Sequence, residues 1–299
     1  MKVGNAFDNV GPILKANIQP TIAYLNELIF KPLNITEDMW TSELGSVGKK
    51  DQSGDIDIAL DMPKLFELFK TDDAKLIKSI IVNKLSDEGI ANRLIQNNVH
   101  MSFPIQGSQQ GEYVQIDLLP AINMEYTKQM HHSPGQGESK YKGAHRGNGL
   151  KSLIKSVSTV IADDAQDNEK QEYIAPDGTK YPGLRFKYIS AKDDGFYYVT
   201  KSFIGKSGKI VKTPQTDKSQ NKFLTYDLQE VLDLLFGKGK YTIADTFSFE
   251  TIWNNILMDP SFPYKDKLDE IIQALYSMYE KDLYIDPPTE IIEYLNKWI

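Results

Sequence analysis

The chain has 299 residues, 40% of them hydrophobic and 25% charged, the composition of an ordinary globular protein with room for two domains. It has no cysteine, so disulfides, thiol catalysis and cysteine zinc sites are excluded. No apolar run approaches the roughly 20 residues of a membrane-spanning helix, and the N-terminal sequence lacks the basic-then-apolar layout of a signal peptide. We therefore expect a cytoplasmic protein without a membrane partner.

The first third of the chain predicts helices around one strand. Apolar residues at helical spacing predict a helix over residues 18–30, with Pro20 in its first turn. Apolar and acidic residues alternate between residues 55 and 61, which is the period of a half-buried strand. Two helices are expected to follow, over Pro63–Phe69 and Asp72–Leu85, with Asp72 as the N-cap of the second.

Two further strands are expected over Val99–Ile105 and Tyr113–Leu119, joined by the turn-rich residues 106–111. We therefore expect residues 1–130 to form an α/β domain with a small sheet. Residues 131–149 are too rich in glycine for regular structure, and we expect them to form a basic functional loop or a linker.

Residues 150–299 are expected to form a mostly helical second domain. It begins with a helix over Leu150–Ala165 and contains an antiparallel β insertion at about 173–212, whose strands are separated by turn signals at 176–178, 193–195 and 207–208. Apolar spacing predicts helices from residue 226 onward. The fold class predicted for the whole chain is therefore α+β.

Two acidic residues of the predicted strand carry the first chemical signal. Asp55 and Asp57 are two residues apart, so they point to the same face of the sheet. Neighbouring carboxylates repel each other unless a cation neutralises them, and Mg²⁺ favours a few carboxylates together with substrate phosphates. Two such ions about 3.5–4 Å apart clamp the attacking and leaving oxygens of an in-line displacement. We expect two Mg²⁺ ions here, with Mn²⁺ as the alternative.

A two-metal site needs a third carboxylate, and Asp117 is the candidate. It lies in the otherwise apolar sequence QIDLL, where an unpartnered acid is costly. We expect Asp117 to ligate the catalytic metal and to draw the proton from the attacking hydroxyl.

A glycine-serine turn, separated from Asp55 by eight residues, supplies a phosphate site. Gly45 lets the backbone approach a phosphate closely, and the amides of a tight turn form an anion-binding nest. The Ser46 hydroxyl can donate to a phosphate oxygen. Lys49 and Lys50 follow in the connecting loop, where we expect them to neutralise triphosphate charge.

This combination resembles the DNA polymerase beta-like nucleotidyltransferase superfamily. The sequences SGDIDIAL and VQIDLLPA are similar to the palm of family X polymerases, and the resemblance covers roughly residues 40–120. It implies that residues 1–130 form a catalytic domain, the nucleotidyltransferase palm, in which helices flank a small mixed sheet. It also implies two Mg²⁺ ions and transfer of NMP from an NTP with release of pyrophosphate. By position, the resemblance assigns the metal-binding triad to Asp55, Asp57 and Asp117, and the phosphate-binding turn to Gly45 and Ser46.

The chain departs from the superfamily pattern in two respects. The loop after the serine usually carries an arginine near a glycine, whereas this chain has Val-Gly-Lys-Lys. Lysine meets phosphate as a point charge and lacks the bidentate fork of arginine. In addition, no helix-hairpin-helix signature of the family X polymerases is evident outside the palm.

Two basic segments stand out in a chain whose formal net charge is −7. In the first, Ser139–Lys155, we expect Lys140, Lys142 and Arg146 to counter phosphate charge while Tyr141 stacks on a base. The alternative is a basic linker between domains. The second, Lys201–Lys222, has six lysines and one acid beside the aromatic residues 196–198. Such a segment can hold single-stranded nucleic acid, although the aromatic side chains suit the core of the insertion equally.

The sequence thus predicts a Mg²⁺-dependent nucleotidyltransferase with an NTP substrate. The basic segments favour an RNA or DNA 3′ end as the acceptor, whereas the net acidity favours a small molecule or a second nucleotide. A protein hydroxyl is a third acceptor. A non-catalytic nucleotide-binding module is the alternative from another functional class.

Overall fold

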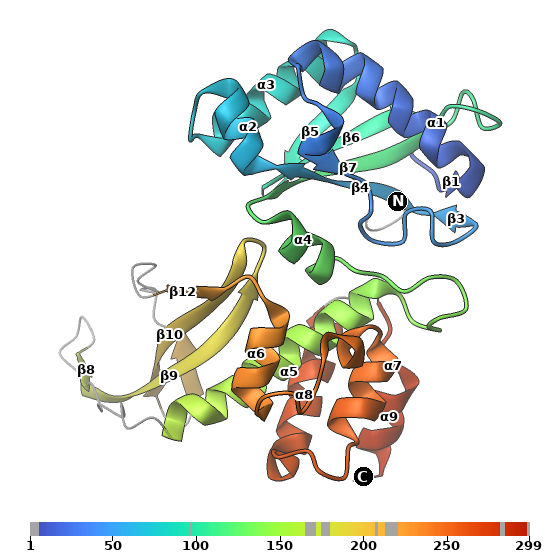
Figure 1. Ribbon diagram of the computed structural model, residues 1–299. Helices are drawn as coiled ribbons and strands as arrows, with labels where there is room; N and C mark the ends of the chain where they lie inside the picture. The colour runs from blue at the N-terminus through green and yellow to red at the C-terminus, as the bar shows by residue number, and fades with distance from the viewer. Residues whose placement is uncertain are drawn as a thin grey trace. The chain divides into compact units, whose positions relative to one another are not determined.

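The computed structural model describes residues 6–95, 97–164, 172–174, 180–206, 209–212, 221–281 and 285–297. The chain divides into two compact units, Met1–Ala144 and His145–Ile299 (Figure 1). This division falls within the predicted linker, residues 131–149. Among the described residues, no helix has both the length and the apolar composition that crossing a bilayer requires.

A five-stranded mixed sheet forms the centre of the first unit, with the strand order β2-β4-β7-β6-β5. Strands β4 and β7 are parallel, and the other neighbouring pairs are antiparallel. The strands are β2 (Trp40–Thr41), β4 (Asp55–Asp61), β5 (Ala91–Ile95), β6 (Asn98–Pro104) and β7 (Tyr113–Ala121). A separate antiparallel pair joins β1 (Ile13–Leu14) to β3 (Gln52–Ser53), next to the start of β4.

The central sheet has one apolar and one polar face because its strands alternate. Ile58, Leu118 and Val99 are paired across β4, β7 and β6 and are buried. Apolar side chains of α1, α2 and α3 pack on this face, and Figure 1 shows the three helices over it. The alternate positions of the same strands are mostly polar and include the three acidic residues. The hydrophobic face therefore fixes the direction in which the acidic side chains point.

Local signals explain where the helices of the first unit begin. Asp61 caps α2 by accepting a hydrogen bond from the Lys64 amide, and Asp73 caps α3 through the Lys75 amide. These helices, with the short turns that follow α1, are α1 (Lys15–Leu25), η1 (Asn26–Phe30), η2 (Lys31–Leu33), η3 (Glu37–Met39), α2 (Met62–Phe69), α3 (Ala74–Asp87) and α4 (Met124–Met130).

Several predictions for the first unit need correction. The N-cap of the second predicted helix is Asp73 and not Asp72, because the Asp73 side chain makes the capping contact. The first helix begins at Lys15, so Pro20 lies in its second turn and withholds the backbone bond that an N–H there would donate. Strand β5 was not predicted. It is an edge strand whose residues are mostly exposed, so it lacks the alternation that identifies a half-buried strand.

The prediction that residues 131–149 lack regular structure is wrong for their last third, where helix α5 (Gly143–Asp164) begins. Two of the three glycines there, Gly143 and Gly149, allow close packing. A methyl group at position 143 would lie 2.8 Å from the Ser133 Cβ, and one at position 149 would lie 3.4 Å from a Phe249 ring carbon. Apolar residues of α5 at helical spacing, Leu150, Leu153, Ile154 and Val157, are fully buried.

The second unit contains the expected antiparallel sheet, with the order β11-β10-β9-β8 and β12 also paired to β10. The strands are β8 (Glu172–Ile174), β9 (Lys180–Lys192), β10 (Gly195–Lys206), β11 (Lys209–Lys212) and β12 (Lys222–Thr225). The predicted turn at 193–195 joins β9 to β10. The turn signals at 176–178 and 207–208 and the end of the predicted helix at Ala165 lie outside the described residues. Strand β12 extends the sheet beyond the predicted limit of 212.

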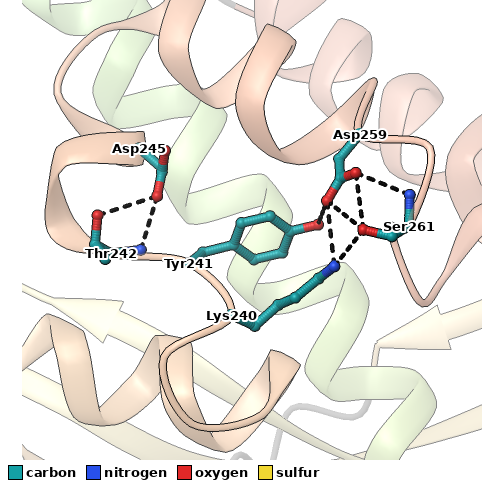
Figure 2. A network of polar contacts seen from close by, with 6 residues as sticks. All are labelled: Lys240, Tyr241, Thr242, Asp245, Asp259 and Ser261. Atoms are coloured by element: carbon teal, nitrogen blue, oxygen red, sulfur yellow. Dashed lines mark hydrogen bonds and ion pairs between the residues drawn. The ribbon is translucent and has the colours of Figure 1, made fainter.

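The rest of the second unit is mostly helical, as expected. Its elements are α6 (Leu228–Phe236), η5 (Ile243–Thr246), α7 (Phe249–Thr251), η6 (Ile252–Leu257), η7 (Lys265–Lys267), α8 (Leu268–Lys281) and α9 (Thr289–Asn296). Figure 2 shows how the segment after α6 is tied to the segment after η6: Asp259 accepts hydrogen bonds from the Tyr241 hydroxyl at 2.7 Å and from the amide of Ser261 at 2.8 Å.

Candidate metal centre

Three carboxylates from two parallel strands meet on the polar face of the first unit. Asp55 and Asp57 lie on β4, and Asp117 lies directly opposite Asp57 on β7. One carboxylate oxygen from each residue lies within 4.8 Å of the others, and all three side chains are half-buried. Residues far apart in the sequence thus offer three oxygen ligands, which is the donor type that Mg²⁺ and Mn²⁺ prefer.

The electrostatics of the triad call for a cation. Burial, followed by the negative charges of Asp55 and Asp117, raises the pKa of Asp57 to about 8. Burial and the charge of Asp117 raise the pKa of Asp55. Burial also raises the pKa of Asp117, although His100 and Gln115 oppose this rise. A divalent ion would neutralise the repulsion, so the residues present fit the predicted metal.

Two residues that sequence reasoning missed hold the Asp117 carboxylate. The Gln115 side-chain amide donates to both carboxylate oxygens, at 3.0 and 3.1 Å, and Nδ1 of His100 lies 2.7 Å from Oδ1. His100 lies on β6, directly opposite Asp117. The sequence does contain a signal for it, because the polar residues His100 and Ser102 alternate with the buried apolar residues of β6.

The glycine-serine turn lies against the triad. Gly45 has a φ of +55°, and a methyl group at this position would lie 2.7 Å from Oδ2 of Asp57. Both the left-handed backbone and the close approach therefore require glycine. The Ser46 carbonyl accepts a hydrogen bond from the Ser53 hydroxyl at 3.2 Å, which ties the turn to β3 just before β4.

A segment that follows α4 also holds this turn in place. The amide of Gly45 donates to the carbonyl of His131 at 2.9 Å, and the amide of Gln136 donates to the carbonyl of Lys49 at 3.1 Å. The Lys49 ammonium donates to the Ser133 carbonyl at 3.0 Å. Lys49 therefore restrains the turn, while Lys50 next to it is half-buried. The predicted contact of either lysine with triphosphate stays a prediction.

The basic residues of Ser139–Lys155 have different environments. Lys140 and Lys142 are exposed, and the Lys140 ammonium lies 4.9 Å from the centre of the Tyr141 ring. Arg146 is 2% exposed, and its Nε donates to the Thr246 carbonyl at 2.6 Å. We therefore assign Arg146 to the interior of the second unit and not to a phosphate site. Apart from Lys222, which is exposed, the lysine side chains of the second basic segment, Lys201–Lys222, lie outside the described residues.

No protein-family model and no curated protein sequence matches the chain. The interpretation of the site therefore depends on the residues themselves. What the residues establish is a cluster of three carboxylates suited to a divalent cation, adjoining a tight turn with a left-handed glycine.

Proposed function

We propose that the protein is a divalent-metal-dependent nucleotidyltransferase of the DNA polymerase beta-like superfamily. It transfers NMP from an NTP to a hydroxyl acceptor and releases pyrophosphate. The observation that carries the proposal is the position of Gly45, whose backbone lies against the carboxylate of Asp57 within the triad. A turn suited to phosphate and a set of ligands suited to Mg²⁺ adjoin each other, as a metal-bound triphosphate requires.

Each residue has a distinct part in the proposed reaction. Asp55, Asp57 and Asp117 hold the metal, and the turn at Gly45 and Ser46 binds the β- and γ-phosphates. Bound Mg²⁺ supplies positive charge that offsets the charge of the triphosphate. Asp117 accepts the proton of the attacking hydroxyl while the oxygen of that hydroxyl bonds to the α-phosphorus. The bond from that phosphorus to the pyrophosphate oxygen breaks, and pyrophosphate leaves with the electron pair.

We infer a nucleic-acid 3′ end as the favoured acceptor. Lys151 and Lys155 are exposed one turn apart on α5, and Lys140 and Lys142 are exposed two residues apart in the segment before it. Neighbouring cations of this kind bind a phosphate backbone. The net charge of −7 supports the second candidate, in which a small molecule or another nucleotide accepts the NMP, because an acidic surface repels a polyanion.

Incubation of the pure protein with each α-labelled NTP and Mg²⁺, with and without RNA or a DNA oligonucleotide, tests the proposal. We expect label in the nucleic acid and release of pyrophosphate. Asp55→Asn combined with Asp57→Asn should abolish both, whereas Asp72→Asn, an exposed acid on the same unit, should retain them. Turnover that survives the double substitution would overturn the mechanism. Label in a small nucleotide or in the protein would assign the alternative acceptors.

A further inference from the structure

A single row of paired residues crosses four strands of the polar face. Asp57 on β4 pairs with Asp117 on β7, Asp117 pairs with His100 on β6, and His100 pairs with Arg93 on β5. Directly paired residues project from the same face of a sheet. The row therefore runs from two metal-ligand candidates through an imidazole to a guanidinium.

His100 makes a specific contact within this row. Its Nδ1 lies 2.7 Å from Oδ1 of Asp117, and the two side chains are 14% and 13% exposed. Because an ionised carboxylate only accepts hydrogen bonds, the ring carries a proton on Nδ1 in this contact. Gln115 bridges both oxygens of the same carboxylate, and its own carbonyl is fixed by the amide of Ala6 at 2.7 Å. Two donors, one on β7 itself and one on the neighbouring strand β6, thus define the orientation of Asp117.

We propose that His100 is a positioning residue of the metal centre, which holds the Asp117 carboxylate in the orientation that binds the cation. This inference rests on the proposed metal-dependent function. The charge of Asp55 repels Asp117, so an unrestrained Asp117 side chain would turn away from it when no metal is present. Hydrogen bonds to a ligating carboxylate prevent this, and their removal typically costs about 10–100-fold in metal affinity or activity.

A purely structural role for His100 predicts a different result. Strands β6 and β7 are joined along their length by backbone pairing from Val99 to Pro104, and the opposite face of β6 carries the buried core residues Val99, Met101 and Phe103. Loss of the imidazole should therefore leave the fold in place. Its effect should appear at the carboxylate and at the bound cation.

Three variants separate the possibilities. His100→Leu removes the donor, whereas His100→Asn retains one, because the Asn amide nitrogen occupies nearly the position of Nδ1. Arg93→Leu is the matched control. It removes a full positive charge from the next position of the row, where the guanidinium lies over the Phe7 ring at 5.1 Å, and it leaves the hydrogen bonds of Asp117 unchanged. Lower positive charge favours cation binding, so Arg93→Leu should bind Mn²⁺ at least as tightly as the wild type.

The primary readout is Mn²⁺ binding to the nucleotide-free protein, followed by electron paramagnetic resonance. We expect His100→Leu to weaken Mn²⁺ binding about tenfold or more, to lower kcat by a similar factor and to change the KM for NTP by less than threefold. His100→Asn should stay within threefold of the wild type in all three quantities. Circular dichroism should show the same secondary structure for every variant.

The outcomes distinguish this inference from the proposed function. The inference would be overturned if the wild type binds Mn²⁺ and the Mn²⁺ affinity of His100→Leu lies within threefold of it. It would also be overturned if His100→Asn binds Mn²⁺ as weakly as His100→Leu. A wild-type protein that does not bind Mn²⁺ would overturn it as well. If the wild type binds Mn²⁺ and the His100→Leu loss is seen, but no NTP is turned over with any acceptor, the positioning role stands and the proposed function fails.

Discussion

The ammonium of Lys49 donates a hydrogen bond to the carbonyl oxygen of Ser133, 3.0 Å away. The contact joins the candidate phosphate turn to a segment 84 residues later in the chain. The side chain of Gln136 adds a second contact by donating to Asp51 at 3.2 Å. Lys49 thus has a structural partner that the sequence does not indicate. A lysine that follows a glycine-serine turn is expected to bind phosphate and not a backbone carbonyl.

This contact predicts how the turn responds to Lys49→Met. A typical hydrogen bond stabilises by about 1 kcal/mol and one from a charged donor by about 1.5–3 kcal/mol, so its loss should increase local opening by about fivefold or more. We expect the amides of residues 45–50 to exchange with deuterium at least about fivefold faster in the metal-free protein, as measured by mass spectrometry. Lys50→Met is the matched control and should leave the exchange unchanged. Equal exchange in the wild type and Lys49→Met would contradict the role of this contact.

Gly45→Ala should damage the site in two ways. A left-handed conformation costs a residue with a Cβ roughly 1–2 kcal/mol, and the new methyl group would lie 2.7 Å from Oδ2 of Asp57. We expect a lower melting temperature together with weaker Mn²⁺ binding. Gly48→Ala is the matched control, because Gly48 has a φ of +69° but no heavy atom within 4 Å of its added Cβ. It should share the stability loss and retain the Mn²⁺ affinity. Equal Mn²⁺ affinity in the two variants would show that the contact with Asp57 is unimportant.

The parts of the site that could be predicted from sequence depend on strand alternation. Ile56 and Ile58 of β4 and Ile116 and Leu118 of β7 are buried on one face of the sheet, so the acidic residues that alternate with them lie on the other face. His100 was missed because its role depends on the register between β6 and β7, which no local pattern encodes. The start of α5 was missed for a similar reason. Glycine at position 143 suggests a loop, whereas the structure requires a glycine there because Ser133 lies too close for a larger side chain.

The network of Figure 2 predicts a measurable contribution of Tyr241 to the second unit. Tyr241 is 4% exposed and donates to Asp259 at 2.7 Å. Tyr241→Phe keeps the buried ring and removes this bond, so we expect it to lower the free energy of unfolding by about 1–2 kcal/mol in urea titrations. Tyr113→Phe, at an exposed position, should have no effect. A Tyr241→Phe variant as stable as the wild type would contradict this assignment.

The same network should respond to acid. The amide of Ser261, followed by the Tyr241 hydroxyl, holds the pKa of Asp259 well below its usual range. The folded state therefore favours the ionised carboxylate, and its contribution to stability is present above about pH 4 and is lost as the pH falls through the folded-state pKa. Asp259→Asn should accordingly destabilise the protein at pH 7 and make little difference at the lowest pH at which it remains folded. Equal destabilisation at both pH values would contradict an electrostatic origin.

The triad predicts that the stability of the metal-free protein depends on pH in the opposite direction. The pKa of Asp57 is raised to about 8, so between about pH 4 and pH 8 the folded protein keeps a proton that the unfolded chain releases. In EDTA, the wild type should therefore lose stability as the pH rises through this window, by up to about 1.4 kcal/mol per pH unit. Asp57→Asn carries no such proton and should be more stable than the wild type at pH 7.5, with the difference shrinking toward pH 4.

Bound metal should have the opposite effect on the wild type and stabilise it more as the pH rises. Cation binding requires the ionised carboxylate and displaces the retained proton, so metal affinity rises with pH. We expect 10 mM Mg²⁺ to raise the melting temperature of the wild type clearly at pH 8 and much less at pH 5.5, and to leave that of Asp57→Asn nearly unchanged. Asp72→Asn should behave like the wild type. Stabilisation by Mg²⁺ that is equal at the two pH values, or equal in wild type and Asp57→Asn, would mean that the cation binds elsewhere, because only binding at the triad must displace the proton of Asp57.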